Sequence, residues 1–173
     1  MRYFDNIDYL AMGNPKQRKL FSVLSVYGIL DEIIEYKPIV TGTIPIEIDT
    51  GDSDVDISCQ WKDRPSFIKT LKKFERFDDF IITEKFIHSN DTIIARFKLD
   101  GFPFEIFGQN RPVKEQEAYR HMIIEYKILK QKGNRFRNEI IRLKKSGMTT
   151  EPAFGKLLGF TDNPYKQLLE YEI

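Results

Sequence analysis

Cysteine is nearly absent from this chain, because Cys59 is the only one in 173 residues. A single cysteine excludes an intramolecular disulfide and a cysteine-based zinc cluster. The sequence also lacks any apolar run near the roughly 20 residues that a membrane span needs. Its first residues, MRYFDNIDYLAMG, contain Asp5 and Asp8 and have no apolar core before a small-residue cleavage site, unlike a signal peptide. We therefore expect a cytoplasmic protein without a membrane partner.

An excess of charge of one sign is also missing, since 27 basic and 26 acidic side chains leave a net charge of +1. The charges are nevertheless unevenly distributed. Residues 1–110 carry 14 basic and 18 acidic side chains, a net charge of −4, and residues 111–150 carry 11 basic and 4 acidic, a net charge of +7. This asymmetry suggests an anionic partner across both parts, although a charged helix face is more often simply solvated.

The length and the hydrophobic pattern predict an α+β protein. We expect a mixed sheet of about five strands with flanking helices, residues 1–110 as an α/β core and residues 111–173 as a helical C-terminal subdomain packed on it. The predicted strands cover residues 38–41, 54–61, 80–87, 92–99 and 102–107. The predicted helices cover residues 15–27, 65–77, 115–130 and 134–145, and two shorter ones open near 150 and 163.

Local signals predict several ends of these elements. Asn14 is a plausible N-cap with Pro15 at the first helical position. The dipeptide Asp100-Gly101 is a strong signal for a tight hairpin turn between two strands. Gly133 separates the two long C-terminal helices, and Asn163 precedes a proline that opens the last one.

Aspartate is crowded in the stretch TGTIPIEIDTGDSDVDISC, which contains Asp49, Asp52, Asp54 and Asp56. Strand alternation places Asp54 and Asp56 on one face of the sheet, while Val55 points into the core. One interpretation is a solvated turn. The other is a divalent metal site, since two carboxylates on one face can share Mg²⁺, which prefers oxygen ligands.

A third acid would complete such a site. Glu105 is the candidate, because it is the one acid within the apolar strand FPFEIF. It could also be an ordinary outward-facing residue, and Asp100 could replace it as the third acid if the strand register differs. Upstream, Gly42 lets a backbone approach a phosphate closely, and the Thr43 hydroxyl can donate to a phosphate oxygen.

A calcium loop is the rival metal site. Asp52, Asp54 and Asp56 match the first half of an EF-hand loop. The match then fails, because Ile57 stands where the loop needs glycine and Asp63 stands where it needs glutamate. No helix is predicted immediately before it, so the pattern does not favour this alternative.

The spacing of these residues resembles a known signature. Gly42-Thr43, ten intervening residues and then Asp54-Val55-Asp56-Ile57 resemble the motif of the polymerase-beta-type nucleotidyltransferase superfamily. The stretches GTIPIEID, SDVDI, QEAYRHM and TEPAFGKLLG look like landmarks of a small bacterial family within it, known only as a domain of unknown function. The second resemblance covers nearly the whole chain.

The resemblance implies a magnesium-dependent nucleotidyltransferase, with Mn²⁺ as an alternative metal. Asp54 and Asp56 would hold the metals, and Glu105 would complete the second metal site and help activate an acceptor hydroxyl. Gly42 and Thr43 would hold the phosphates of a nucleoside triphosphate, with Ser53 as a further phosphate-binding candidate. The segment between Gly42 and Asp54 departs from the superfamily, because it contains Pro45 and several acids and no obvious helix.

The C-terminal helices supply further candidates. Arg120, with Lys127 and Lys130, could grip a triphosphate or an acidic acceptor. His121 lies between two acids at helical spacing and could be an acid or base, or an ion-paired surface residue. Tyr119 could stack on a base, although packing at the subdomain boundary is the simpler interpretation.

A basic run on the next helix suggests RNA, but no stacking aromatic pattern accompanies it. The run contains Arg135, Arg137, Arg142, Lys144 and Lys145. The second histidine, His88, adjoins a predicted turn and is expected to be structural or exposed.

Three functions remain open on the sequence. The first is an enzyme that transfers a nucleotidyl group from a nucleoside triphosphate to an unidentified acceptor, which could be a small molecule, a protein or an RNA. The second is a catalytically inactive protein of the same fold that binds a nucleotide, an RNA or a partner. The third is an RNA-binding module built on the basic helix. The sequence names neither the base, nor the acceptor, nor the oligomeric state.

Overall fold

The computed structural model describes residues 4–51, 53–87 and 89–172 of the chain. Five strands form one sheet: β1 (Ile39–Thr41), β2 (Val55–Gln60), β3 (Asp78–Ile87), β4 (Asn90–Leu99) and β5 (Phe102–Gln109). The α-helices are α1 (Asp8–Ala11), α2 (Pro15–Tyr27), α3 (Ile29–Glu32), α4 (Arg64–Leu71), α5 (Glu117–Lys145), α6 (Thr150–Leu158) and α7 (Pro164–Leu169). Three short 3-10 helices cover Ile34–Tyr36, Lys72–Arg76 and Val113–Glu115.

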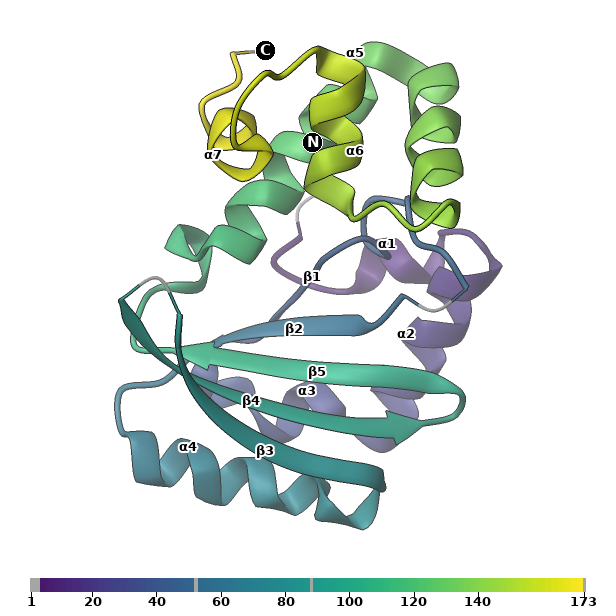
Figure 1. Ribbon diagram of the computed structural model, residues 1–173. Helices are drawn as coiled ribbons and strands as arrows, with labels where there is room; N and C mark the ends of the chain where they lie inside the picture. The colour runs from purple at the N-terminus through teal and green to yellow at the C-terminus, as the bar shows by residue number, and fades with distance from the viewer. Residues whose placement is uncertain (1–3, 52, 88, 173) are drawn as a thin grey trace.

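The sheet is mixed, as the sequence predicts, with the strand order β1-β2-β5-β4-β3 (Figure 1). Strands β2 and β5 run parallel, and the other neighbouring pairs run antiparallel. The parallel pair is central to the site because it brings two segments nearly 50 residues apart in sequence into direct register, with Asp56 opposite Glu105. The α+β fold expected from the sequence is therefore confirmed.

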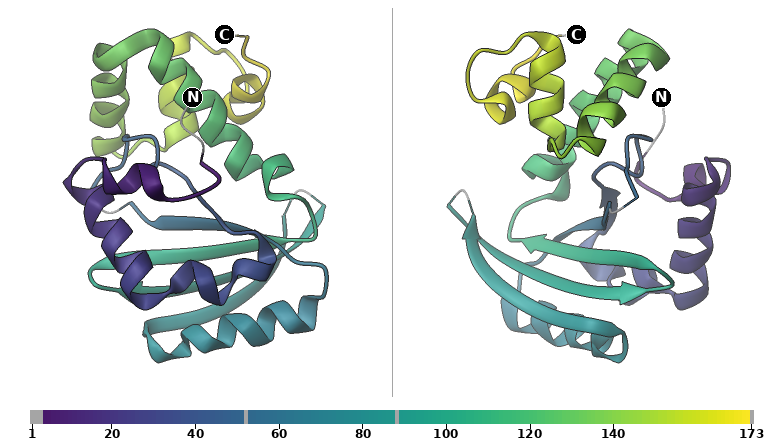
Figure 2. Two further views of the ribbon diagram at one scale, coloured as in Figure 1. Left: turned by 180° about the vertical axis from the view of Figure 1, so that it is seen from behind. Right: turned by 45° about the vertical axis from the view of Figure 1, so that its right-hand side comes forward.

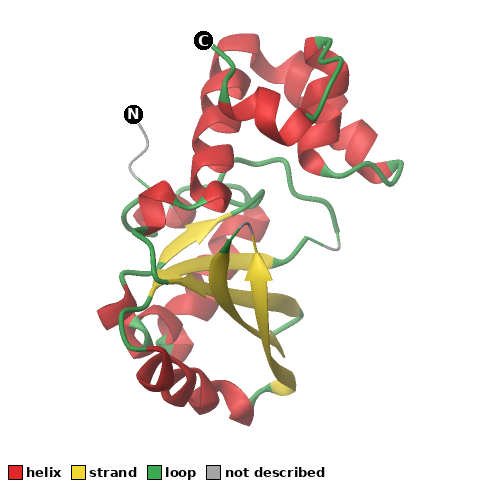
Figure 3. Ribbon diagram, turned by 60° about the vertical axis from the view of Figure 1, so that its left-hand side comes forward, coloured by secondary structure: helices red, strands yellow, loops and turns green. Residues whose placement is uncertain are grey.

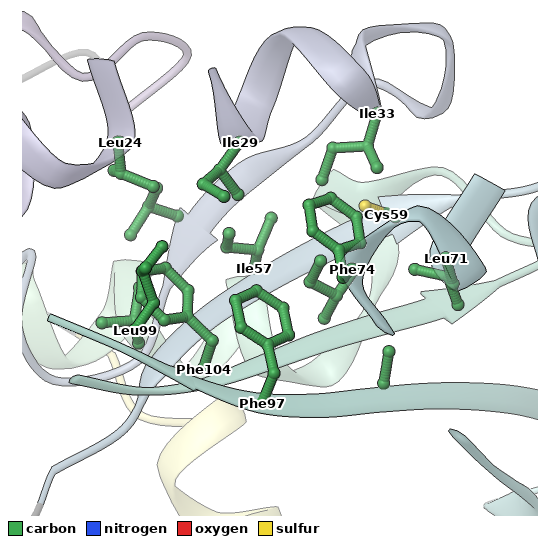
Figure 4. Packing of buried hydrophobic residues seen from close by; sticks show 14 of the residues in the cluster. Leu24, Ile29, Ile33, Ile57, Cys59, Leu71, Phe74, Phe97, Leu99 and Phe104 are labelled. Atoms are coloured by element: carbon green, nitrogen blue, oxygen red, sulfur yellow. The ribbon is translucent and has the colours of Figure 1, made fainter. Parts of the chain in front are cut away.

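One face of the sheet carries the main hydrophobic core. Helices α2, α3 and α4 lie against this face, as the view from behind shows (Figure 2). Val55 is fully buried in the core, which confirms its predicted direction in β2, and Ile57 is buried beside it. Phe97 stacks between Phe74 and Phe104, with ring centroids 5.2 and 5.0 Å apart (Figure 4). Alternation therefore sends the side chains of Asp56 and Glu105 to the opposite face.

Several local predictions are confirmed in detail. Asn14 caps α2, where its side chain accepts a hydrogen bond from the backbone N–H of Gln17 in a capping box. Asp100 and Gly101 both have positive φ, as the tight hairpin between β4 and β5 requires. Asn163 caps α7, where its side chain accepts hydrogen bonds from the backbone N–H groups of Tyr165 and Lys166, and Pro164 opens the helix as predicted. Strand β2 begins at Val55, one residue later than expected, so Asp54 immediately precedes it.

The three C-terminal helices gather beyond the β1 edge of the sheet (Figures 1 and 3). Their apolar side chains form a second hydrophobic cluster that also takes in Ile39, Ile46 and Ile48 from the first part of the chain. Gly133 has φ 76° and interrupts α5, which matches the two separate helices predicted there. None of the described helices has both the length and the hydropathy that a bilayer span requires.

The predicted boundary between residues 110 and 111 follows the end of β5, but it stays a prediction. The shared second cluster shows that the helical part packs on the segment between β1 and β2. A pocket lies where these two parts meet, and the site is built around it.

Candidate active site

The sheet forms the floor of a pocket of about 290 Å³. On this floor the strand register places Asp56 of β2 between Thr41 of β1 and Glu105 of β5. One row further along, Ser58 faces the same pocket, and its hydroxyl shares a 3.0 Å hydrogen bond with the Thr41 hydroxyl. Two carboxylates and two hydroxyls from three neighbouring strands therefore meet on one small surface.

Gly42 follows β1 and contacts Asp56 in a way that only glycine permits. A Cβ at this position would lie 2.0 Å from Oδ2 of Asp56 and 2.9 Å from its carboxyl carbon. The residue also has φ 75°, a conformation that side chains with a Cβ rarely adopt. The backbone of Gly42 thus packs directly on the Asp56 carboxylate, and Thr43 lines the pocket beside it.

The surroundings of Asp56 oppose its negative charge. Burial, together with the nearby charges of Glu105 and Asp54, raises the pKa of its carboxyl group to about 7, while Lys144 acts in the opposite direction. A carboxylate beside two other acids gains stability from a cation placed between them. The floor therefore has the electrostatic character of a cation site.

Glu105 already has one cationic neighbour. Arg96 of β4 lies opposite Glu105 in the strand register, and its guanidinium forms an ion pair with that carboxylate at 2.5 Å. Asp100, the alternative third acid, lies in the hairpin turn, where its backbone carbonyl accepts a hydrogen bond from Lys19. The structure thus brings Glu105, and not Asp100, next to Asp56.

The helical part supplies the opposite wall of the pocket. Ala118, His121, Met122 and Glu125 line the pocket from one face of α5, at the spacing of successive helical turns. Glu151 adds a further carboxylate from the first turn of α6. The pocket is therefore walled by carboxylates on both sides.

Glu125 is the most deeply buried acid of this wall, with 3% of its surface exposed. Burial raises the pKa of its carboxyl group well above the ordinary value, and the charge of Glu151 adds to this, while Lys144 lowers it. Among the residues that the structure describes, none donates a hydrogen bond to the Glu125 carboxylate. The side chain lines the pocket without such a partner.

His121 is held in one orientation. Its Nε2 lies 3.0 Å from the carbonyl oxygen of Tyr165 in α7, to which it donates a hydrogen bond. Its Nδ1 lies 3.9 Å from a carboxylate oxygen of Glu151. The sequence placed His121 between acids on its own helix, whereas the close carboxylate comes from α6. The residue is buried, so the interpretation as an exposed surface residue is wrong.

Cations from α2 and α5 hold the segment between β1 and β2. Arg137 donates to the carbonyl oxygen of Ile46 at 2.6 Å and forms an ion pair with Glu47 at 3.2 Å. Lys144 donates to the carbonyl oxygen of Ile48 at 2.9 Å. Lys16 does the same for Thr50. Two residues of the predicted RNA-binding run therefore point into the protein and anchor this segment.

Four predicted residues lie outside the lining of the pocket. Ser53 faces a separate hollow beside α2, and its hydroxyl accepts a hydrogen bond from the backbone of Thr50. Arg120 is exposed, and Tyr119 packs against the second hydrophobic cluster, as the simpler interpretation had it. Asp54 is exposed at the start of β2 and acts on Asp56 through its charge. Asp52 and His88 lie outside the described residues.

Sequence reasoning selected His121 of the helical wall but missed Glu125, Glu151 and the role of Lys144. Burial lowers the pKa of the Lys144 ammonium, while Glu125, Asp49, Glu151 and Asp56 all act on it electrostatically in the opposite direction. One signal was available in the sequence, since Glu125 shares a helical face with Ala118 and Met122, where an acid is unusual. The tertiary approach of Glu151 and Lys144 left no such signal.

The side chains on the floor are of the type that binds a divalent metal, but two adjacent carboxylates form only part of a coordination shell. Among the described residues, no group of three histidine, cysteine, aspartate or glutamate side chains is placed to hold a metal ion. Asp56 and Glu105 still supply adjacent oxygen donors of the kind that Mg²⁺ and Mn²⁺ prefer. Their mutual repulsion is the physical feature that a bound divalent cation would relieve.

Comparison with family models identifies the group to which this sequence is assigned. The model of a domain of unknown function, DUF4269, matches residues 22–171. The chain belongs to the DUF4269 family. No curated protein matches this member of the family significantly.

Solved structures share the fold of this DUF4269 protein. A Cid1 poly(U) polymerase with Mg 3'-dATP bound has 13% identity and a TM-score of 0.57, with 90% of this chain and 48% of that chain covered. The structure of a GLD-2/RNP-8 complex has 15% identity and a TM-score of 0.52, with 87% and 57% covered.

The polymerase core of TRAMP, an RNA surveillance complex, has 10% identity and a TM-score of 0.52, with 93% and 51% covered. The chain thus spans about half the length of these proteins. At such identities the likeness establishes that this chain shares the fold of these proteins.

Proposed function

We propose that this protein transfers a nucleotidyl group from a nucleoside triphosphate to an acceptor. The observation that carries the proposal is the direct register of Asp56 with Glu105, on a pocket floor where the Gly42 backbone packs against Asp56. The fold, shared with the Cid1 poly(U) polymerase that was solved with Mg 3'-dATP, supports the same activity.

Asp56 and Glu105, with Asp54 at the entrance to β2, would hold Mg²⁺ or Mn²⁺. When bound, the metal would stabilise negative charge on the attacking and leaving oxygens. The backbone at Gly42 and the Thr43 hydroxyl would orient the phosphates of the donor at the edge of the floor. Burial of the floor would strengthen each of these interactions.

The reaction is an in-line displacement at the α-phosphorus. The acceptor oxygen forms a bond to phosphorus, and the bond to the pyrophosphate oxygen breaks with its electron pair leaving on pyrophosphate. The proton of the acceptor hydroxyl passes to a carboxylate of the floor, for which Glu105 is the proposed group. An acceptor that is a small molecule, a protein or an RNA satisfies this chemistry equally.

A catalytically inactive binding module is the second candidate. The ion pair between Arg96 and Glu105 favours it, because a guanidinium already occupies one side of the third proposed metal ligand. Such a protein would bind a nucleotide, an RNA or a partner in the same pocket and would not depend on a metal.

Thermal unfolding with each of the four nucleoside triphosphates, with and without Mg²⁺, separates these candidates. A ligand at 100 times its dissociation constant stabilises a protein by about 2.7 kcal/mol. We expect a Mg²⁺-dependent shift with at least one nucleotide, lost in Asp56→Asn and Asp54→Ala and kept in the exposed control Asp162→Asn. A shift that is independent of metal and survives both substitutions would support the inactive binder instead.

A further inference from the structure

The pocket has a second charged wall that the proposed metal site does not use. Glu125 and Glu151 line it from α5 and α6, facing the floor formed by Asp56 and Glu105. No lysine or arginine is among the described residues that line this pocket. A nucleoside triphosphate with its metal would complement the carboxylates of the floor. The two carboxyl groups of the helical wall would still lack a complementary cation.

Glu125 is the strongest pointer to a ligand. Its side chain is 97% buried, since 3% of its surface is exposed, and it lines the pocket. Within the described part of the chain it has neither a hydrogen bond nor an ion pair. Burying an acid without a partner in a low-dielectric site destabilises the folded protein. A ligand that supplies a cation or a hydrogen-bond donor would offset this penalty.

Lys144, the lysine that interacts electrostatically with this wall, makes its hydrogen bond elsewhere. Lys144 acts electrostatically on Glu125, but its ammonium donates a hydrogen bond to the carbonyl oxygen of Ile48 at 2.9 Å. His121 holds its Nε2 hydrogen bond to Tyr165 and turns Nδ1 towards Glu151 at 3.9 Å. These contacts fix the wall and leave the Glu125 carboxylate open to the pocket.

The size and the lining of the pocket limit the ligand. About 290 Å³ is space for a small molecule or for one end of a larger one. Ala118, Met122 and Phe107 add apolar surface between the carboxylates, which suits a carbon chain or ring. An RNA end would bring phosphates against the two acids of the helical wall, and this repulsion favours a cationic acceptor.

We propose that Glu125 and Glu151 bind a protonated amino group of the acceptor, so that the acceptor is a small amino alcohol. This inference rests on the proposed function for the transfer itself, and the acceptor hydroxyl would then approach the floor while its ammonium contacts the helical wall. Glu125 and Glu151 are binding residues in this scheme and exchange no proton with the reacting atoms.

A series of compounds of equal chain length tests the proposal without a nucleotide. Calorimetry would compare cadaverine, aminopentanol and pentanediol on the full chain. The two ammonium-bearing compounds should bind at least about tenfold more tightly than the diol. Glu125→Gln should remove most of that preference, and so should the more exposed substitution Glu151→Gln, which keeps the test valid if the first variant folds poorly. The matched control Glu170→Gln, on the surface near the end of α7, should retain it.

Equal binding of the three compounds, absence of binding by both amines, or an undiminished preference in both variants would overturn the proposal. A failure of the proposed function looks different. In that case the Mg²⁺-dependent shift with nucleoside triphosphates is missing from the native protein, whatever the amines do. Displacement of cadaverine by a single-stranded RNA oligonucleotide would also contradict a small cationic acceptor.

Discussion

Asp56 lies where burial and two neighbouring acids oppose its charge, and this sets the pH dependence of the metal-free protein. Its pKa rises from the ordinary 3.8 to about 7 in the folded state, so the folded chain binds the proton more tightly than the unfolded chain. The contribution of Asp56 to stability is therefore fully present below pH 3.8 and is lost as the pH rises towards about 7.

We predict that Asp56→Asn stabilises the metal-free protein at pH 8, because the amide removes the buried charge. The gain should be about 2 kcal/mol, given about 1.4 kcal/mol for each unit of pKa shift and partial relaxation of the variant. It should shrink at pH 5, where the native carboxyl is largely protonated. Urea unfolding at the two pH values measures this, and an equal gain at both would contradict the raised pKa.

Gly42 gives the second prediction at this scale. Gly42→Ala places a Cβ against the Asp56 carboxylate and forces a residue with a side chain into positive φ. We expect a loss of about 1–3 kcal/mol in the free energy of unfolding. Gly51→Ala is the matched control, since a Cβ there meets no atom within 4 Å. Urea unfolding of both variants checks this, and equal costs would show that the contact with Asp56 does not matter.

The sequence predicts part of the site at the residue scale. Asp56 and Gly42 belong to one local motif, and Glu105 is conspicuous as an acid in an apolar strand, so spacing and alternation are sufficient to select them. Glu125, Glu151 and Lys144 meet only through the packing of α5 and α6 on the sheet. Local patterns carry no information about such contacts, and the roles of all these residues stay predictions.

Among the elements, α5 holds the helical part against the segment between β1 and β2 through side-chain hydrogen bonds. Its second half directs Arg137 and Lys144 towards backbone carbonyl groups of that segment. The basic residues that suggested RNA binding therefore have different contacts. Arg137 and Lys144 hold the chain segment in place, and Arg142 forms an ion pair with Glu139. Arg135 and Lys145 remain exposed.

We predict that Lys144→Met destabilises the protein by about 1–3 kcal/mol, since it removes a charged hydrogen-bond donor and a cation that interacts electrostatically with four carboxylates. Lys145→Met changes the exposed neighbour in the same helix and should have an effect within about 0.5 kcal/mol. Urea denaturation compares the two. Similar small effects would mean that Lys144 does not anchor the segment between β1 and β2.

Elements with strong local signals are the ones that the sequence predicts well. The Asp100-Gly101 turn and the break at Gly133 require a positive φ that few residues adopt, and the Asn14 cap requires a side chain that accepts a backbone hydrogen bond. The short helices α1 and α3 were missed, because each has only four residues and no amphipathic period to detect. Their formation depends on packing against α2 and the sheet.

In the molecule as a whole, the buried apolar residues form two hydrophobic clusters. The first joins the sheet to α2, α3 and α4, and the second joins the C-terminal helices to Ile39, Ile46 and Ile48. These three isoleucines belong to the part of the chain predicted as the α/β core. The pocket takes its walls from both parts, so its geometry depends on their association.

We therefore predict that the two parts unfold together. Scanning calorimetry should give one transition with equal calorimetric and van't Hoff enthalpies, as for a cooperative domain of this size. Two resolved transitions would instead indicate that the helical part is an independent domain, with the pocket formed at a loose interface.

The binding of Mn²⁺ tests the central claim most directly. Electron paramagnetic resonance reports the free ion, so it measures binding in the presence of a non-hydrolysable nucleoside triphosphate without requiring the acceptor. We predict one or two bound ions at pH 8, with affinity reduced at least about tenfold in Asp56→Asn and unchanged in Asp162→Asn. Equal Mn²⁺ binding by the native protein and Asp56→Asn would contradict a metal-dependent nucleotidyltransferase site on this floor.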